Sequence, residues 1–438
     1  MNNSASKRLS FSAWIVVLVA ASVVGFIAYF FAFMGKQSDL FRDSVSHNTS
    51  WLLYLLPAIG LTSITLLRFK FFNGTEGTGI PQTIAALEQE TDTEKQSLLS
   101  PKILLGKILL TTVGLFSGAS MGREGPTVQA GACIMFYCRK IVSLPQHVVQ
   151  RGLILAGGAA GIAAAFNAPA AGIVFSIEEI GRSFDKRNLG VLLAVVVVAC
   201  AFCIGLFGDY WFYGDIPISL ASNAEWALVP VVAIGMGLLG GLFSRFIVYF
   251  YPRVMKVMMA RPVLVPMGIG LAIGLLGWLS AGQTLGTGFI EAKIMLVQGE
   301  ELDWYYAPLR LFATALTLLS GIPGGLFDPS LSAGAGFGQW FSDLAHTFEW
   351  GKDVDSKMIM MIAMACFFAA VVQSPITSVV IMAEMTNSIY AIMPMLAGAL
   401  IAYAISTRIC SCSIYVALAS TYFKDSRLDE SPREACID

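Results

Sequence analysis

The sequence has 438 residues, of which 56% are hydrophobic and only 13% are charged. Soluble proteins carry about 25% charged residues, so this composition excludes an ordinary soluble domain and predicts an integral membrane protein. The formal net charge of −1 and the lack of a basic cluster argue against a nucleic-acid partner.

The first apolar run covers residues 13–34 and is long enough to cross about 30 Å of hydrocarbon. It is too long for the apolar core of a signal peptide and lacks a clear small-residue cleavage site. Lys7 and Arg8 precede it, and positive charge beside a first span favours a cytoplasmic N-terminus.

Further apolar segments follow along the chain, separated by polar breaks too short for a soluble domain. Several are too short, or too interrupted by glycine and proline, to be straight spans. Non-helical backbone at membrane depth must be buried in protein or line a watery cavity, so we expect half-spanning helices that meet inside the protein. We predict one transmembrane domain over 1–438 with a short cytoplasmic tail at about 417–438. The later apolar segments are 51–67, 101–121, 150–176, 189–213, 227–250, 263–281, 305–322, 357–384 and 389–409.

Three short patterns occur twice, in the same order and roughly two hundred residues apart, which is the mark of a duplicated unit. In an apolar chain with Gly/Pro-interrupted helices, duplicated halves predict a transporter of two inverted-topology repeats with its site where they meet. We place the repeats at about 13–213 and 225–412. The patterns are Gly-Thr-Gly at 77–79 and 286–288, Gly-x-x-x-Pro at 122–126 and 325–329, and a proline followed by a glutamate at Pro169 and Glu178 and at Pro375 and Glu384.

The Gly-x-x-x-Pro motif has the composition of a helix start. Proline suits the first turn of a helix, where its missing N–H costs nothing, so Pro126 places a helix N-terminus here. Gly122 and Gly125 allow a tight turn whose free N–H groups carry partial positive charge and bind anions. The second copy at 324–329 and the segment 77–81 are built alike. Two or three such helix starts converging would hold an anion weakly enough to release it, as conduction requires.

Two sets of carboxylates lie in or beside apolar segments. Glu124 stands at the first of these helix starts, and a carboxylate inside a membrane is a functional candidate by default. Its carboxylate could occupy an anion site and leave it when protonated; the alternative is an ion pair with the adjacent Arg123. Glu178 and Glu179 end an apolar run, where they are either a proton relay or interfacial charges paired with Arg182.

The motifs Gly122–Pro126, Gly325–Pro329 and Gly77–Pro81 resemble the three anion-site motifs of the CLC family of chloride channels and transporters. The segment 165–169 and the pair Glu178-Glu179 resemble the same family, in the same order, over nearly the whole chain. The resemblance implies an all-α polytopic fold of two inverted repeats built from tilted and half-spanning helices. It also implies a two-fold dimer with one anion path in each subunit.

The resemblance also implies roles for individual residues. Glu124 would be the external gating glutamate, and Glu179 the internal proton-transfer glutamate that exchangers carry and channels usually replace. Arg123 and Lys107 would supply positive field near the path. The anion would be bound by the hydroxyl groups of Thr78 and Tyr415 and the backbone N–H groups of Leu326 and Phe327.

The sequence departs from the family pattern in three respects. Thr78 replaces a serine, which keeps the hydroxyl but adds a methyl group, so chloride remains the expected ion. Asp328 fills a slot that is usually apolar; it either makes transport more acid-dependent or caps its own helix. The cytoplasmic regulatory domain pair of many eukaryotic members is not found, which favours a prokaryotic protein in the inner membrane.

These features predict a chloride/proton antiporter, with a passive voltage- or pH-gated chloride channel on the same fold as the alternative. Glu179 favours the antiporter. Enzyme activity is not expected, because no H-E-x-x-H motif is present. The three histidines are far apart in sequence, so neither a metal site nor another cofactor is expected. The expected partners are chloride, protons, the lipid bilayer and a second copy of the chain.

Overall fold

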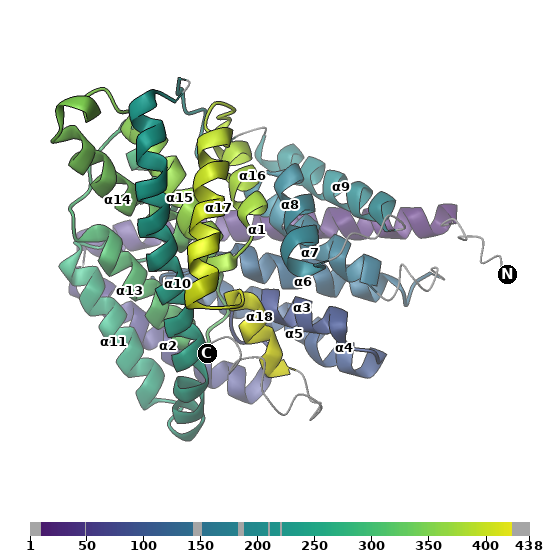
Figure 1. Cartoon of the computed structure of the whole chain (residues 1–438). Helices are drawn as coiled ribbons and strands as arrows, with labels where there is room; N and C mark the ends of the chain where they lie inside the picture. The colour runs from purple at the N-terminus through teal and green to yellow at the C-terminus, as the bar shows by residue number, and fades with distance from the viewer. Residues whose placement is uncertain are drawn as a thin grey trace.

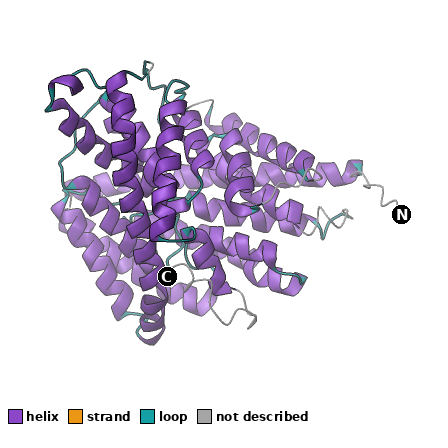
Figure 2. Cartoon of the chain, in the orientation of Figure 1, coloured by secondary structure: helices purple, strands orange, loops and turns teal. Residues whose placement is uncertain are grey.

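The computed structural model describes residues 10–48, 50–142, 151–182, 188–208, 211–219 and 221–422, which form helices and loops without any strand (Figure 2). Lys7, Arg8 and the end of the predicted tail lie outside these residues. The first half of the chain forms α1 Phe11–Asn48, α2 Ser50–Phe71, α3 Ile80–Glu88, α4 Asp92–Leu98, α5 Pro101–Phe116, α6 Glu124–Cys138, α7 Leu153–Phe166, α8 Pro169–Phe175 with a π-helical end Ser176–Ile180, and α9 Leu189–Phe207.

The second half repeats this order of long and short helices. Helix α10 and helix α1 each have 38 residues, about 57 Å of helix, which exceeds the hydrocarbon thickness of a bilayer. The elements are α10 Asn223–Ala260, α11 Leu264–Leu279, α12 Phe289–Lys293 with a π-helical end Ile294–Gln298, α13 Tyr306–Leu319, α14 Phe327–His346, α15 Ser356–Val372, α16 Pro375–Thr386, α17 Ile392–Ile409 and α18 Ile414–Ala419.

Two predicted segments, 150–176 and 357–384, are each broken into two helices at equivalent points. Asn167 (φ 53°) ends α7, and Gln373 (φ 58°) ends α15; both adopt the left-handed conformation that stops a helix. A proline then starts the next helix at Pro169 or Pro375. The duplication therefore places a helix break at the same point in both halves, although the residue in the left-handed conformation is an asparagine in one half and a glutamine in the other.

The two halves pack in the same way internally and meet along matching helices. In the first half α6 packs on α7 and α1 on α9; in the second half α14 packs on α15 and α10 on α17. The halves contact each other where α2 meets α11 and where α8 meets α16. Figure 1 shows α10 and α17 upright at the front, with α1 crossing behind them. The residue bounds proposed for the repeats stay a prediction.

Within the described residues, six helices are long and apolar enough to cross a membrane: α1, α2, α4 with α5, α9, α10 and α17. The short helices α3, α8 and α12 begin at glycine- or proline-containing turns inside the protein, as expected for half-spanning elements. Helix α18 keeps residues 417–419 buried, and the start of the cytoplasmic tail stays a prediction.

Candidate functional site

The two Gly-x-x-x-Pro motifs lie against each other, so that α6 and α14 begin side by side. The N–H of Gly122 donates to the carbonyl of Gly325 (2.7 Å), and the N–H of Gly325 donates to the carbonyl of Gly122 (2.6 Å). Among the described residues, the next N–H groups, those of 123–125 and 326–328, have no hydrogen-bond partner. Two groups of free N–H dipoles therefore meet in one buried place.

Glu124 lies over this meeting point. Its side chain is fully buried, and no described N–H or O–H group donates to either carboxylate oxygen. A Cβ atom on Gly122 would stand 2.0 Å from Oε2 of Glu124, so only glycine leaves room for the carboxylate. The guanidinium of Arg123 lies over the ring of Phe212 at 5.7 Å from its centroid. The expected alternative, an Arg123–Glu124 ion pair, is therefore not formed.

The Gly-Thr-Gly turn at 77–79 packs against the first turn of α6. A Cβ atom on Gly125 would lie 2.6 Å from the carbonyl oxygen of Thr78, which accounts for the second glycine of the motif. Gly79 has a positive φ of 97°, a conformation that favours glycine, and it directly precedes α3. The buried hydroxyl of Thr78 accepts a weak hydrogen bond from the N–H of Ile80 (3.4 Å).

The side chain of Lys107 stabilises this turn through hydrogen bonds to its backbone. Its ammonium group is fully buried and donates to the carbonyl groups of Thr75 (3.0 Å), Glu76 (3.4 Å) and Gly77 (2.8 Å). A buried cation is stable only when such acceptors surround it, so the charge and the turn stabilise each other. Lys107 thus acts through the backbone that carries Thr78.

The aromatic rings of Phe327 and Tyr415 pack against each other near the start of α14. Leu326 and Phe327 are fully buried, and the rings of Phe327 and Tyr415 stack with centroids 6.3 Å apart. Tyr415 is on α18, and its buried hydroxyl has no hydrogen-bond partner among the described residues.

Glu179 is almost fully buried at the end of α8 and is held by residues of the second half. Its carboxylate accepts hydrogen bonds from the hydroxyl groups of Ser413 (2.6 Å) and Ser374 (3.1 Å). Arg182 stands 3.8 Å away. Ser413 also caps α18, the helix that carries Tyr415, by accepting the N–H of Val416 (3.3 Å). Glu179 lines a pocket of about 500 Å³.

Glu178 makes different contacts from the adjacent Glu179, because it caps a helix of the second half. Its carboxylate accepts the N–H groups of Ile376 (3.2 Å) and Thr377 (2.7 Å) at the start of α16. In return, Glu384 of α16 accepts the N–H groups of residues 170 (3.1 Å) and 171 (2.7 Å) at the start of α8. Each half therefore caps a helix of the other half through the repeated proline–glutamate pattern.

Asp328 lies in the first turn of α14 and is almost fully buried. Its Oδ1 atom has no hydrogen-bond partner among the described residues, and no side chain caps α14, so the expected capping role is not observed. Glu124 lies beside the turn that leads into α14, since a Cβ atom on Gly325 would stand 3.0 Å from its Oε2 atom. Asp328 also lines a pocket of about 450 Å³, which we call the Asp328 pocket.

Arg310 was not predicted, although the repeat points to it. It precedes Gly325 by the same distance that separates Lys107 from Gly122. Fully buried, it donates to the carbonyl groups of Gly286 (2.8 Å) and Gln283 and pairs with Glu291 (3.4 Å). It therefore supports the second Gly-Thr-Gly turn, as Lys107 supports the first.

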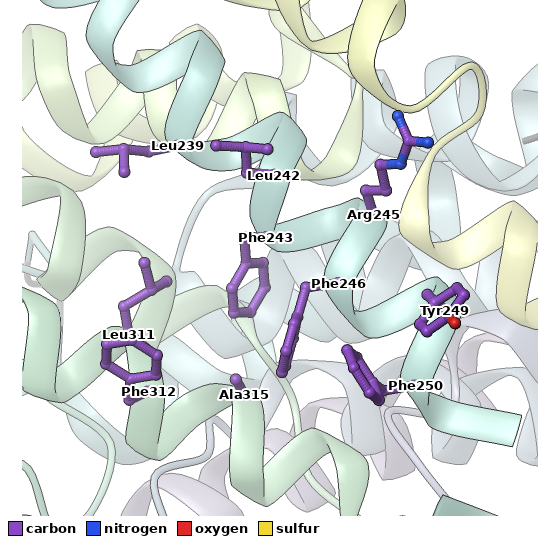
Figure 3. A pocket seen from close by; sticks show the side chains of 10 residues that line it. All are labelled: Leu239, Leu242, Phe243, Arg245, Phe246, Tyr249, Phe250, Leu311, Phe312 and Ala315. Carbon is purple, nitrogen blue, oxygen red and sulfur yellow. The ribbon is translucent and has the colours of Figure 1, made fainter. Parts of the chain in front are cut away.

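A separate pocket of about 520 Å³ lies between α10 and α13 (Figure 3). It is almost entirely apolar, and several of its rings are exposed, as expected for a surface that faces hydrocarbon. None of the candidate site residues lines it. Its lining residues are Leu239, Leu242, Phe243, Arg245, Phe246, Tyr249, Phe250, Leu311, Phe312 and Ala315.

The family profile described as "Voltage gated chloride channel" matches residues 59–407, well over half of the chain. The chain belongs to the CLC family. The fold of this CLC protein is shared with several solved structures. One is a slow cyanobacterial Cl⁻/H⁺ antiporter (22% identity, TM-score 0.85, 96% of this chain and 100% of that chain).

Two further CLC structures have the same fold. A CLC-type fluoride/proton antiporter aligns with 23% identity and a TM-score of 0.78 over 94% of this chain and 99% of that chain. A eukaryotic CLC transporter aligns with 21% identity and a TM-score of 0.75 over 94% of this chain and 74% of that chain. The resemblance noted in the sequence is thereby confirmed at the level of family and fold: an all-helical, multi-pass membrane protein.

Proposed function

We propose that this CLC protein is a secondary-active antiporter that exchanges chloride for protons. The observation that carries the proposal is the position of Glu124: a buried carboxyl group without a hydrogen-bond donor, set where two groups of free helix N–H dipoles meet. A carboxylate and a chloride ion would compete for the same dipoles. Protonation removes the charge of Glu124 and favours its departure, which would couple proton binding to anion movement.

The anion site proposed here uses dipoles in place of full charges. Chloride would be bound by the free N–H groups of Leu326 and Phe327 and by the hydroxyl groups of Tyr415 and Thr78. Gly122, Gly125 and Pro126 would shape the α6 side of the site. Arg123 and Lys107 would add positive field, Lys107 through the turn that it holds. Such a site favours chloride while still releasing it.

Glu179 is proposed as the second proton-carrying group. The symmetry of the fold supports this choice. Glu178 and Glu384 occupy equivalent positions and perform equivalent caps, whereas the equivalent of Glu179 is Met385. The duplicated packing therefore does not require a carboxylate at position 179. Protons would pass between Glu179 and Glu124 through the region of Tyr415.

Purified protein in liposomes tests the proposal when a chloride gradient is imposed and external pH and chloride are recorded together. Chloride-driven proton movement against its own gradient would support the antiporter, and Glu124→Gln should then abolish proton movement while chloride flux continues. Chloride flux without proton movement would instead favour the passive channel. Fluoride should be compared in the same assay, because one similar structure is described as a fluoride/proton antiporter.

We further propose that the protein is a homodimer in a bacterial inner membrane, with both termini cytoplasmic, and that the chain forms a single transmembrane domain. Subunit counting by single-molecule photobleaching in liposomes tests the dimer, since a monomer would bleach in one step. Cysteine labelling of either terminus from outside intact cells tests the topology; efficient labelling would contradict it.

A further inference from the structure

The Asp328 pocket has an unusual content of carboxylates for an anion path. Asp328 lies at its buried side, while Asp39 and Asp43 line its more exposed part together with Lys36 and Arg123. Asp39 pairs with Arg42. The pocket joins exposed side chains to buried Asp328 and so offers a route by which protons from water could reach its carboxylate.

Asp328 connects this pocket to Glu124. Glu124 lies against the glycine turn that leads into α14, the helix that carries Asp328. A Cβ atom on Gly325 would stand 3.0 Å from Oε2 of Glu124, and neither oxygen of Glu124 receives a hydrogen bond from any described N–H or O–H group. The other titratable or charged groups that face Asp328 are Arg123 of the α6 turn, Asp39 of α1 and Tyr213 of the loop after α9. The hydroxyl of Tyr213 is buried and has no described partner.

Two carboxyl groups that lie close together and are shielded from water can share a proton. The fold itself does not require this pair, because the equivalent of Asp328 in the first half is Gly125. Asp328 does not cap its helix, and the guanidinium of Arg123 is placed over Phe212. The remaining chemistry that the pair can perform is transfer of a proton between its two members.

We propose that Asp328 is a proton-transfer residue that passes protons between the Asp328 pocket and Glu124. A proton from water in the pocket binds the carboxylate of Asp328, and the Asp328 carboxyl group then gives its proton to the carboxylate of Glu124. Asp328 is left ionised and ready for the next proton. This inference rests on the proposed antiport function and adds a second carboxyl group to its proton path.

The test compares wild-type protein with Asp328→Asn in the chloride-gradient liposome assay, over a range of pH on the side of the Asp328 pocket. Asparagine has nearly the same shape but cannot relay a proton. Asp43→Asn is the matched control, because Asp43 lines the same pocket but is exposed, whereas Asp328 is buried. Asp328→Glu restores a carboxyl group and serves as the conservative rescue.

Asp328→Asn should lower proton transport roughly tenfold or more, the effect expected when a positioned proton donor is lost, while chloride flux continues. The proton-transport pH profile should change in Asp328→Asn, remain as in wild type in Asp43→Asn, and be partly recovered in Asp328→Glu. Continued chloride flux shows that a variant is folded. If Asp328→Asn failed to fold, loss of coupling in Asp328→Ala with recovery in Asp328→Glu would support the same conclusion.

Equal proton transport in wild type and in a chloride-conducting Asp328→Asn would overturn the role of Asp328 and leave the antiport function intact. An equal loss in Asp43→Asn would also overturn it, because general attraction of protons by the pocket would then explain the effect. Absence of coupled protons in the wild type would overturn both the antiport function and this inference.

Discussion

Substitution of Gly122 by alanine isolates the contact between the glycine bridge and Glu124. The three atoms nearest to the added Cβ would all belong to the Glu124 carboxyl group, with Oε2 at 2.0 Å, whereas an ordinary contact is 3.4 Å or longer. The carboxyl group must therefore move by more than about 1 Å, and overpacking of this kind costs about 1–3 kcal/mol. Alanine keeps the backbone N–H, so the hydrogen bonds to Gly325 remain possible.

This cost falls on the position in which the Glu124 carboxylate competes with chloride. At 1.4 kcal/mol per factor of ten, the population of that position should fall by about 5- to 150-fold. Isothermal titration calorimetry of chloride binding should show an increase in affinity of up to that factor. The same substitution in a Glu124→Ala background should have little effect, because the clashing group is gone. Gly205→Ala in α9 is a neutral control, since nothing lies within 4 Å of its added Cβ.

The reasoning would be refuted if Gly122→Ala left chloride affinity unchanged in an otherwise normal, folded protein. It would also be refuted if the shift were equally large in the Glu124→Ala background. In that case the substitution would act on the helix N-termini themselves and not through the carboxyl group.

Three further predictions concern the groups around the site. Glu179→Gln should abolish proton coupling while sparing chloride flux in the liposome assay. Glu178→Gln should leave coupling unchanged but lower thermal stability by about 1–2 kcal/mol, as loss of a helix cap does. The opposite pattern would exchange the roles of the two glutamates. Thr78→Val should weaken chloride binding in calorimetry and Thr78→Ser should not, because only valine removes the hydroxyl; equal affinities would exclude the hydroxyl from the site. Lys107→Met and Arg310→Met should each destabilise the folded protein by at least about 2 kcal/mol, since buried carbonyl groups would lose a charged donor, and thermal unfolding monitored by size-exclusion chromatography should show a lower midpoint. An unchanged midpoint in either variant would contradict the account of that turn.

The sequence was sufficient to predict the helix starts, because they depend on local chemistry. Glycine and proline at 122–126 and 325–329 specify turns and first helical residues within a short stretch. The repeat also indicated that the two starts are equivalent. The hydrogen bonds between Gly122 and Gly325, by contrast, join residues from opposite halves, and no local pattern specifies which faces of two helices meet.

The partners of Glu179 could not be predicted for the same reason. Ser374 and Ser413 belong to the second half, and a serine before a helix is too common to indicate a contact with one particular carboxylate. The different tasks of Glu178 and Glu179 likewise depend on the direction in which α8 presents each side chain. Tyr415 lies beyond the predicted second repeat, so only resemblance to the CLC family pointed to it. Arg310 could have been found from the repeat alone.

The reciprocal caps of Glu178 and Glu384 have the form expected of two identical chains that bind each other through a two-fold symmetric interface. In such an ancestral pair, a single codon would have encoded the capping glutamate of both partners, so any mutation would have changed both caps at once. Fusion into a single chain separated the two copies and let them diverge around an interface that stayed fixed. The neighbouring position could then become Glu179 in one copy and Met385 in the other. The duplicated fold therefore keeps the two caps between its halves while allowing a titratable residue in one half alone.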